Sequence, residues 1–550
     1  MRQPARPARR TPTRSRPGDG SVRIAAVDIG SNSIRQIVAD VSPEGAIRIV
    51  DEMKSMPRLG TGVMETGVLA ADAMDRAVAA LGRMSMLARQ LGAQRVEVVA
   101  TSAVRDATNG SAFLARVRRE TGLQARVIDG AEEARLSFRS ALAHFDLGTG
   151  RTVVMDIGGG SLELAAAAGG AIDHLASLPL GALRLTETVL RDGIDARSVR
   201  ALRKHVRALL KPELSRDWHG SRLIGSGGTF TNLAAVFLAR EGVTTARNVH
   251  GTDVPRRDLE HVLEWLAAMT SDERRDVPGL NPERADIIVA GLAVAAEVMA
   301  RLECRALEVS RYGIREGILL EAARVVPTIA DTGEARARSV EDLATRCGFE
   351  ERHARIVQAH ALVLFDRLGK RLGLTSDDRR LMADAALLHD VGYHISFDRH
   401  HKHSYHLIVH AELLGITPTD QVMIANVARY HRGAVPKKKH SGYGTLDRAL
   451  RSRIRGMAAL LRIADGFDRG HVGAVKSLAV RVVRRGADPV LRITPVAARS
   501  GDAMRLEIWG AIRKATLLAD VLKMPVQIVA PDGNVVSTDA VDSAELATAS

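Results

Sequence analysis

Short hydrophobic runs alternate with longer amphipathic stretches over the first 325 or so positions of the chain. Two buried strands on either side of a glycine turn are predicted at 24–27 and 34–41. The same strand-turn-strand order returns at 153–168, where the turn begins at Asp156, 128 residues after the corresponding Asp28. A repeat of this length predicts two related domains.

Helical and extended patterns alternate around these repeated units. Amphipathic helices are predicted at 70–91, 107–121, 196–210, 259–270 and 285–302, and further strands at 96–100, 125–128, 222–224 and 307–310. Asp195 is positioned to cap the helix at 196–210. Such alternation is typical of α/β architecture.

The pattern changes after about Pro327. Helical periodicity dominates at 340–374 and 377–389, and from about Ser477 the pattern becomes alternating again, with strands predicted at 478–483, 504–509 and 526–529. These changes predict five segments: a disordered basic tail at 1–22, α/β domains at 23–150 and 151–326, an all-α domain at 335–476 and a small α+β domain at 477–545.

Composition narrows the class of protein. The 550 residues are 46% hydrophobic and 26% charged, which fits a chain that buries several cores. No apolar run reaches the roughly 18 residues of a membrane-spanning helix. Two cysteines, Cys304 and Cys347, lack metal-type spacing and exclude a disulfide scaffold, so we expect a cytoplasmic protein without a membrane partner.

A formal net charge of +14 favours an anionic partner. Aromatic residues make up only 3% of the chain, which disfavours recognition of single-stranded nucleic acid by base stacking, and no specific nucleic acid partner is expected. The charge alone does not distinguish a nucleotide from a polyphosphate.

Three glycine turns carry the chemistry of phosphate binding. Two are the repeated Asp-x-Gly turns, with hydroxyl or amide donors at Ser31, Asn32, Ser33 and Ser161. The third, Gly225-Ser-Gly-Gly-Thr229, follows a predicted strand and precedes a helix, whose N-terminal amides attract anions. Three such turns in one chain predict a site that grips several phosphate oxygens.

Acidic and basic side chains accompany these turns. Asp28 and Asp156 end their strands, where they would either hold a divalent cation or only cap the turns. Arg105 follows the strand at 96–100, where it would either clamp a phosphate or be only a surface arginine of a loop. Glu132 and Glu133 open a helix, where one of them would activate water or both would only stabilise the helix N-terminus.

Six motifs in order resemble the exopolyphosphatase and guanosine pentaphosphate phosphohydrolase family (Ppx/GppA), over residues 23–325. They are Asp28-Ile-Gly-Ser-Asn-Ser33, Ala100-Thr-Ser-Ala-Val-Arg105, Glu132-Glu-Ala-Arg135, Asp156-Ile-Gly-Gly-Gly-Ser-Leu-Glu163, Gly225-Ser-Gly-Gly-Thr229 and Tyr312-Gly-Ile-Arg-Glu-Gly317. The resemblance implies two actin-like (ASKHA, ribonuclease H-like) domains with the active site in a cleft. Arg35 departs from the family, in which Phe-His or a similar pair is common at 34–35.

The resemblance also implies roles for individual residues. Glu133 corresponds to the general base, Glu163 to an acid that helps to hold metal or water, and Arg105 to a group that grips the terminal phosphate, while Asp28, Asp156 and Glu163 would bind Mg²⁺ or another divalent cation. The implied phosphate-binding residues are Ser31, Asn32, Ser33, Gly158, Gly159, Gly160, Ser161, Gly227, Gly228 and Thr229.

Eleven of the eighteen histidines fall between His353 and His440. The ordered set His353, His389-Asp390 and Asp465 resembles the HD-type metal-dependent phosphohydrolase fold, which implies an HD-like helical domain with a second divalent-metal site. Alternatively, this domain keeps the fold and only lines a channel for a long substrate.

The expected activity is that of an exopolyphosphatase, which removes terminal orthophosphate from inorganic polyphosphate with a metal- and glutamate-activated water. The alternative in the same family is hydrolysis of the 5′-γ-phosphate of guanosine pentaphosphate. An actin-like kinase and a non-catalytic polyphosphate sensor are two further classes, and the Glu132-Glu133 pair disfavours the kinase. A homodimer is expected from the general frequency of C2 enzymes.

Overall fold

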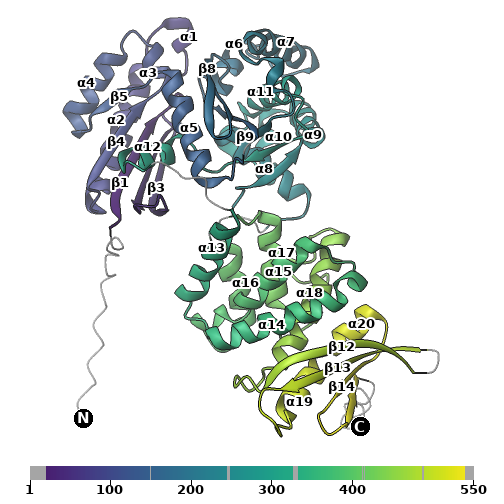
Figure 1. Ribbon diagram of the computed structural model, residues 1–550. Coiled ribbons are helices and arrows are strands. Elements are labelled where there is room, and N and C mark those ends of the chain that lie inside the picture. Colours follow the sequence, from purple (N-terminus) through teal and green to yellow (C-terminus); the bar gives the residue numbers. More distant parts are fainter. Residues whose placement is uncertain are drawn as a thin grey trace, which may run out of the picture. The chain divides into compact units, whose positions relative to one another are not determined.

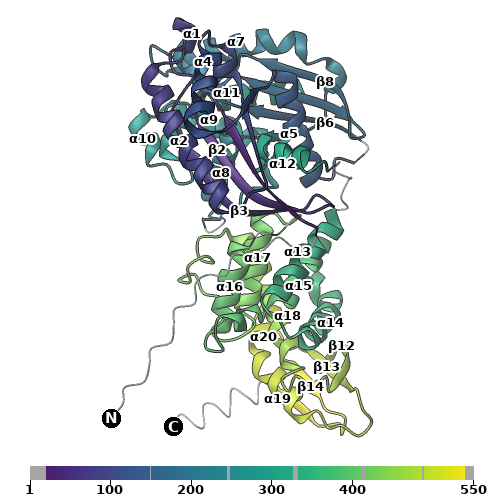
Figure 2. The same cartoon turned by 90° about the vertical axis from the view of Figure 1, so that its left-hand side faces the viewer.

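The computed structural model describes residues 20–148, 150–244, 248–325, 332–411, 413, 415–485 and 488–538, so the predicted basic tail lies almost wholly outside the described residues. The chain divides into two compact units (Figures 1 and 2). The first unit holds the described residues up to Leu233 and those from Asp253 to Val325, and the second holds the described residues of 234–252 and those from Thr332 onward.

The first unit begins with a five-stranded mixed sheet in the order β3-β2-β1-β4-β5. Its strands are β1 (Val22–Ile29), β2 (Ile34–Val41), β3 (Ile47–Ser55), β4 (Arg95–Ala100) and β5 (Ala125–Val127). The first three strands are antiparallel neighbours because short turns join them, whereas β4 and β5 run parallel to β1 after helical crossovers.

A second sheet in the same unit follows the order β8-β7-β6-β9-β11-β10. Its strands are β6 (Arg151–Ile157), β7 (Leu162–Ala168), β8 (Ala171–Leu178), β9 (Arg222–Ser226), β10 (Thr252–Pro255) and β11 (Ala306–Val309). Apart from β10, this order repeats that of the first sheet, with antiparallel β6-β7-β8 and parallel β6-β9-β11. The predicted internal repeat is therefore confirmed at the level of topology.

Helices connect these strands. They are α1 (Val63–Thr66), α2 (Ala71–Gln90), α3 (Ser102–Asp106), α4 (Gly110–Thr121), α5 (Gly130–His144), α6 (Ala182–Thr188), α7 (Ala196–Glu213), α8 (Gly228–Arg240), α9 (Arg256–Ala267), α10 (Ser271–Arg275), α11 (Ile288–Arg301) and α12 (Ile314–Ala322), with 3₁₀ turns η1 (Arg216–Trp218) and η2 (Pro282–Arg284). Asp195 caps α7 as predicted, accepting from the amides of Arg197 and Ser198. After the second sheet, α12 returns to pack on β1 and α5 (Figure 2).

The second unit starts with helices. They are α13 (Thr332–Arg346), α14 (Glu351–Leu368), α15 (Ser376–Leu388), α16 (His400–His410), α17 (Pro418–Arg429) and α18 (Arg448–Gly466), with 3₁₀ turns η3 (Gly369–Leu372) and η4 (Val391–His394). The helix predicted over 340–374 is not continuous. Gly348 adopts a φ of 64°, a left-handed conformation that ends α13 before α14 begins.

A small sheet and two helices complete the second unit. They are β12 (Val475–Arg485), β13 (Asp488–Ala497), β14 (Val526–Val529), β15 (Val535–Ser537), α19 (Arg505–Lys514) and α20 (Thr516–Leu522). The strand predicted at 504–509 was wrong, because this segment opens α19. Its short alternation also fits a helix, in which Glu507, Ile508, Ala511 and Ile512 share the buried face.

One apolar cluster joins the helices and the sheet of the second unit, from Val340 on α13 to Ile528 on β14. Each unit also buries one cysteine thiol, Cys304 in the first and Cys347 in the second. In the described segments, none of the helices is both long and apolar enough to cross a bilayer.

Candidate active site

The two repeated turns close with the same hydrogen bond. The amide of Gly30 donates to the carbonyl of Ser33 at 3.1 Å, and the amide of Gly158 donates to that of Ser161 at 3.0 Å. The strands on either side keep the same register, so Asp28 pairs with Arg35 and Asp156 pairs with Glu163. Arg35 and Glu163 therefore occupy equivalent positions of the two repeats.

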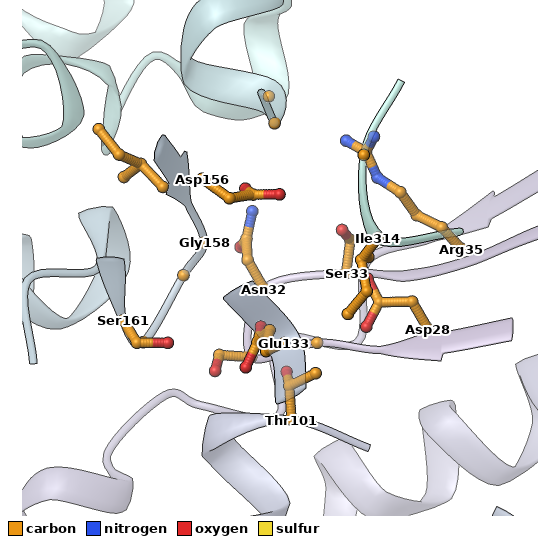
Figure 3. A pocket seen from close by; sticks show the side chains of 18 of the residues that line it. Asp28, Asn32, Ser33, Arg35, Thr101, Glu133, Asp156, Gly158, Ser161 and Ile314 are labelled. Carbon is orange, nitrogen blue, oxygen red and sulfur yellow. The ribbon is translucent and has the colours of Figure 1, made fainter. Parts of the chain in front are cut away.

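A cavity of about 100 Å³ lies between these turns in the first unit (Figure 3). Most of the site residues predicted from the sequence line it. They are Asp28, Ser31, Asn32, Ser33, Glu133, Asp156, Gly158, Gly159, Gly160, Ser161, Gly227 and Gly228. Side chains of both repeats thus reach one small polar chamber.

Contacts between the two turns bring them close together. The Oγ atoms of Ser31 and Ser102 lie 2.8 Å apart, beside Gly160 of the second turn. A Cβ atom on Gly160 would lie 2.1 Å from Oγ of Ser102 and 2.8 Å from Oγ of Ser31, so a larger residue would have to displace these hydroxyls. Because glycine has no side chain, the backbones of the two turns can lie close to each other at the cavity.

The third glycine turn opens α8 beside the second. Gly227 has a φ of 96°, and a Cβ atom there would lie 2.6 Å from Oδ1 of Asp156. Thr229, which the sequence assigned to phosphate binding, does not line the cavity. Its side chain is fully buried toward Gly291 of α11, and Thr231, two residues further along, lines the cavity instead.

Glu133 is the acidic side chain of α5 that faces the cavity. Its Oε2 atom is buried without a hydrogen-bond partner among the described residues and lies 3.6 Å from Nη1 of Arg105. Burial, together with the charges of Glu163 and Asp28, raises the pKa of Glu133 well above its ordinary value. Its neighbour Glu132 points elsewhere and pairs with Arg126.

Glu163 lies behind the cavity wall on β7 rather than on its surface. It is 1% exposed, and the hydroxyl of Ser177 donates to its Oε1 at 3.0 Å. Burial raises the pKa of Glu163 to about 8, even though the hydroxyls of Ser161 and Ser177 stabilise its charged form. The two glutamates are therefore electrostatically linked, with Glu133 at the cavity and Glu163 beneath it.

The paired aspartates differ in their surroundings. Oδ1 of Asp28 is buried and has no partner among the described residues, and burial raises the pKa of this carboxyl to about 6. Asp156 instead accepts hydrogen bonds at Oδ2 from Ser137 at 3.1 Å and from Ser226 at 2.8 Å. Burial also raises the pKa of Asp156.

Arginine side chains in the cavity lining balance the charge of these acids. The sequence analysis assigned a phosphate-binding role to none of these lining arginines. The arginines that line the cavity are Arg35, Arg284, Arg311 and Arg315. Burial and the positive charge of Arg35 together lower the pKa of Arg284 to about 10, so Arg284 is both buried and close to a second positive charge. Arg315 lies in a recognised motif, and Arg35 could have been identified as the repeat partner of Glu163.

Arg105 lies beside the cavity rather than in its lining. Its Nη1 atom donates to the carbonyl of Ile128 at 2.9 Å, which fixes the guanidinium next to Glu133. The residues around the chamber therefore combine four carboxyl groups with at least five guanidinium groups.

The oxygen donors of Asp28, Asp156 and Glu163 suit a hard divalent cation such as Mg²⁺. Asp28 offers an unpartnered buried oxygen, which fits a ligand role. Among the described residues, however, the groups of three potential ligands within 4.8 Å of one another both lie in the second unit. A cation in the first unit would therefore take its remaining ligands from phosphate oxygens and water.

The second unit brings together the four residues predicted as a further metal site. His353 of α14, His389 after α15 and Asp390 offer ligand atoms that all lie within 4.8 Å of one another. Asp465 of α18 has its Oδ1 atom 3.8 Å from Nε2 of His353, while its Oδ2 atom pairs with Lys514. The predicted residues are thus neighbours in space.

Comparison with known proteins follows the same division of the chain. The profile of the Ppx/GppA phosphatase family matches residues 37–325, and that of Ppx/GppA phosphatase, domain III, matches residues 335–496. Exopolyphosphatase 2 of Mycobacterium tuberculosis is 36% identical over 321 residues, covering 55% of this chain and 98% of the relative.

Two further similarities differ in coverage. The guanosine-5′-triphosphate,3′-diphosphate pyrophosphatase of Vibrio campbellii is 28% identical over 445 residues, covering 80% of this chain and 86% of the relative. The crystal structure of an exopolyphosphatase from Cytophaga hutchinsonii has a TM-score of 0.51 and 26% identity, covering 56% of this chain and 100% of that chain.

Proposed function

Since the chain belongs to the Ppx/GppA phosphatase family, whose members hydrolyse phosphoric anhydrides, we propose that it is an exopolyphosphatase that removes terminal orthophosphate from inorganic polyphosphate. The observation that carries this proposal is the unpartnered carboxylate of Glu133 at a cavity lined by the three glycine turns. A buried base beside phosphate-binding backbone suits hydrolysis by water.

Glu133 acts as the general base. The water oxygen forms a bond to the terminal phosphorus while the phosphoanhydride bond to the rest of the chain breaks. Glu133 accepts the water proton, and the shortened polyphosphate leaves with the bonding electron pair. The raised pKa of Glu133 makes this carboxylate a stronger proton acceptor than an exposed glutamate.

The other residues of the site bind the phosphate groups of the substrate and neutralise their charge. Ser31, Asn32, Ser33 and Arg105 grip the terminal phosphate, and the second turn at 158–161 with Gly227 and Gly228 holds the next phosphate. The amide nitrogen and the amide oxygen of the Asn32 side chain are both buried without partners among the described residues, which is expected of a side chain that binds an anion or water. Arg35, Arg284 and Arg315 neutralise the inner phosphates.

A divalent cation of the Mg²⁺ type would be held in the chamber by Asp28 and Asp156, which line it, while Glu163, the third ligand expected from the sequence, lies beneath the cavity wall. When bound, it would neutralise charge on the oxygens of the phosphoryl group that is transferred to water. The unpartnered Asp28 oxygen supports this assignment.

The size of the cavity favours entry of phosphate groups alone. About 100 Å³ is well below the roughly 300–1,000 Å³ of sites that enclose a whole small-molecule ligand. None of the lining residues in the described part of the chain is aromatic. A chain end of inorganic polyphosphate needs nothing more than such a chamber.

A second candidate is hydrolysis of the 5′-γ-phosphate of guanosine pentaphosphate. The similarity to the Vibrio campbellii pyrophosphatase supports it, because that similarity extends over 80% of this chain and includes most of the second unit. Both reactions break a terminal phosphoanhydride bond and use the same groups.

Phosphate release from long-chain polyphosphate, guanosine pentaphosphate and ATP, measured with one enzyme preparation, tests the proposal. We expect the highest kcat/KM with polyphosphate. A preference for guanosine pentaphosphate would establish the second candidate. Transfer of phosphate to an acceptor without release would indicate a kinase, and tight binding of polyphosphate without hydrolysis would indicate a sensor.

For the second unit we propose an HD-like helical domain, with a divalent metal held by His353, His389, Asp390 and Asp465. This site is distinct in its ligands from the phosphate chamber. Replacing both His389 and Asp390 by alanine is expected to leave terminal phosphate release from short substrates within several-fold of wild type. Complete loss of release with intact folding would assign that chemistry to the second unit instead.

A further inference from the structure

Two groups of potential metal ligands meet at Asp390 in the second unit. The first comprises His353, His389 and Asp390, and the second comprises Asp390, His400 and His431. The sequence assigned no ligand role to His400 or His431. They come from α16 and from the end of α17, so three separate helices and the turn after α15 supply the two groups.

The backbone orients the three histidines near Asp390 in the same way. Nδ1 of His389 contacts the carbonyl of Ala386 at 2.7 Å, and Nδ1 of His431 contacts that of Ala428 at 2.7 Å. His400 makes the same type of contact with a carbonyl oxygen at 3.1 Å. Because a carbonyl oxygen only accepts, each Nδ1 carries the proton, and Nε2 of each neutral ring is left as a lone-pair donor.

His353 is oriented by a carboxylate instead. Its Nδ1 atom lies 2.8 Å from Oδ2 of Asp468, a fully buried side chain. This is the arrangement in which a second carboxylate fixes a metal-binding histidine. All four rings therefore direct Nε2 toward Asp390 from an anchored position.

The Nε2 atoms are spaced as ligands of metal ions. Tetrahedral ligands about 2.1 Å from an ion lie about 3.4 Å from one another. Nε2 of His389 lies 3.4 Å from Oδ2 of Asp390, while those of His400 and His431 lie 3.3 and 3.4 Å from its Oδ1. The two oxygens of Asp390 thus face different histidines.

Nothing else in the described residues satisfies these atoms. The four histidines are at most 2% exposed, and Nε2 of His353, Nε2 of His389 and Oδ1 of Asp390 have no hydrogen-bond partner. Nε2 of His400 lies 3.3 Å from Nε2 of His431, so two nitrogen atoms that both carry lone pairs face each other. Buried lone pairs that converge on a carboxylate repel one another unless a cation lies between them.

A cavity of about 460 Å³ opens onto this cluster. Arg432 and Arg469 line it together with His353 and Asp390. Tyr393 and Phe397 also line it, with their ring centres 5.6 Å apart, and the two residues are 39% and 72% exposed. The two neighbouring rings therefore offer an exposed apolar surface beside the cavity that a ligand could cover.

We propose that the second unit holds two divalent transition-metal ions bridged by Asp390, and that this centre hydrolyses phosphate esters of molecules with a planar ring, of which nucleotides are the commonest class. One ion is held by His353, His389, Asp390 and Asp465. The other is held by Asp390, His400 and His431. Imidazole with carboxylate suits Mn²⁺, Fe²⁺ or Zn²⁺ better than Mg²⁺.

The cavity explains the choice of substrate class. Its volume lies within the roughly 300–1,000 Å³ of small-ligand sites, unlike the phosphate chamber of the first unit. The arginines pair with phosphate oxygens, and the rings of Tyr393 and Phe397 provide a stacking surface for a base. Hydrolysis adds water across the ester: its oxygen bonds to phosphorus, the P–O bond to the sugar breaks, and the sugar oxygen takes a proton.

Metal content tests the two-ion centre without reference to activity. The full-length protein is purified with Mn²⁺, freed of loosely bound ions by gel filtration and analysed by mass spectrometry. We expect His400→Ala to lose one equivalent of manganese relative to wild type, and Asp390→Asn to lose two. His406→Ala removes an exposed histidine of the same helix and should lose none.

A loss of only one equivalent in Asp390→Asn, or no loss in His400→Ala, would overturn the bridged pair. Circular dichroism and thermal unfolding of each metal-free variant establish that it folds, and His431→Gln provides a milder second test of the same ion. Because the comparison is between variants of the second unit, any ion bound in the first unit cancels.

Catalysis is tested in a Glu133→Gln background, in which the chemistry of the first unit is disabled. The manganese-loaded protein is given guanosine 5′-monophosphate, adenosine 5′-monophosphate, adenosine 3′-monophosphate and ribose 5-phosphate. We expect phosphate release from at least one nucleotide to exceed that from ribose 5-phosphate at least tenfold, and Phe397→Ala to reduce this ratio. No release from any nucleotide, or equal release from ribose 5-phosphate, would overturn the proposed activity while leaving the exopolyphosphatase proposal unaffected.

Discussion

Nη1 of Arg105 lies 3.6 Å from Oε2 of Glu133 at the edge of the phosphate chamber. The same guanidinium donates to the carbonyl of Ile128, so its position is fixed by the backbone. The positive charge opposes the rise that burial causes in the pKa of Glu133. Arg105 thereby favours the charged form of Glu133, while its guanidinium remains at the edge of the chamber where a phosphate would bind.

Glu133→Gln is expected to lower kcat for phosphate release about 100-fold or more, because general bases contribute roughly 10²–10⁴-fold to catalysis. The amide keeps the shape of the side chain but cannot accept a proton. Glu132→Gln is the matched control, since Glu132 pairs with Arg126 rather than facing the chamber. Turnover of the Glu133 variant close to that of wild type would remove it as the base.

Glu163 is expected to make the metal-free protein less stable as pH rises. Its pKa is raised to about 8 in the folded protein and is near the ordinary 4.5 when unfolded. The folded state therefore retains a proton that the unfolded state loses, and the free energy of unfolding falls as pH rises from about 4.5 to about 8.

Glu163→Gln should remove this dependence. The free energy of unfolding of the variant minus that of wild type should be about 1–3 kcal/mol larger at pH 8.5 than at pH 5, a figure that counts only part of the pKa shift. Denaturant unfolding of both proteins at the two pH values, without metal, measures this increase. An equal difference between variant and wild type at both pH values would contradict the buried, protonated state of Glu163.

Threonines 229 and 231 should respond differently to replacement by valine. Thr231 lines the chamber, so Thr231→Val is expected to raise KM for polyphosphate about 5-fold, the equivalent of one hydrogen bond of about 1 kcal/mol. The Thr229 hydroxyl is buried without a partner among the described residues, so Thr229→Val should leave KM unchanged and should not destabilise the protein. Steady-state kinetics and thermal unfolding distinguish the two; the reverse result would restore the sequence-based assignment.

Gly160→Ala is expected to lower both stability and activity. The new Cβ atom would lie 2.1 Å from Oγ of Ser102 and 2.8 Å from Oγ of Ser31, so it would displace both hydroxyls and break their contact. Overpacking of this kind costs about 1–3 kcal/mol. Gly150→Ala is the control, because a Cβ atom there meets no atom within 4 Å. Equal unfolding midpoints and equal kcat in the two variants would show that the turns need no such close approach.

The sequence predicted those parts of the site whose signal is local. Asp28 and Asp156 each end a strand before a glycine turn, and the repeat alone indicated that the two turns belong together. Hydrogen bonds that close both turns at equivalent residues follow from this local pattern. Arg105 and the Glu132-Glu133 pair were noticed from their places after a strand and at the start of a helix, and the family resemblance then selected Glu133 as the base.

The sequence pattern gave little indication that arginines would line the chamber. Arg284 comes from η2 and Arg315 from α12, far along the chain from the turns they face, and only the fold brings them together. Thr229 was assigned by its place in a glycine motif, but helical geometry turns its side chain toward α11 and leaves Thr231 at the cavity. His400 and His431 were noticed as part of a histidine-rich stretch, yet composition could not assign them to one carboxylate.

The reactivity of the two buried cysteine thiols can be used to measure the local stability of each unit. Cys304 belongs to the first unit and Cys347 to the second, and burial raises the pKa of each thiol, that of Cys304 to about 11. Both are therefore poorly reactive until their surroundings open. Pulse alkylation followed by peptide mass spectrometry would yield separate opening rates for the two units, and added polyphosphate or Mn²⁺ would reveal which unit each ligand protects.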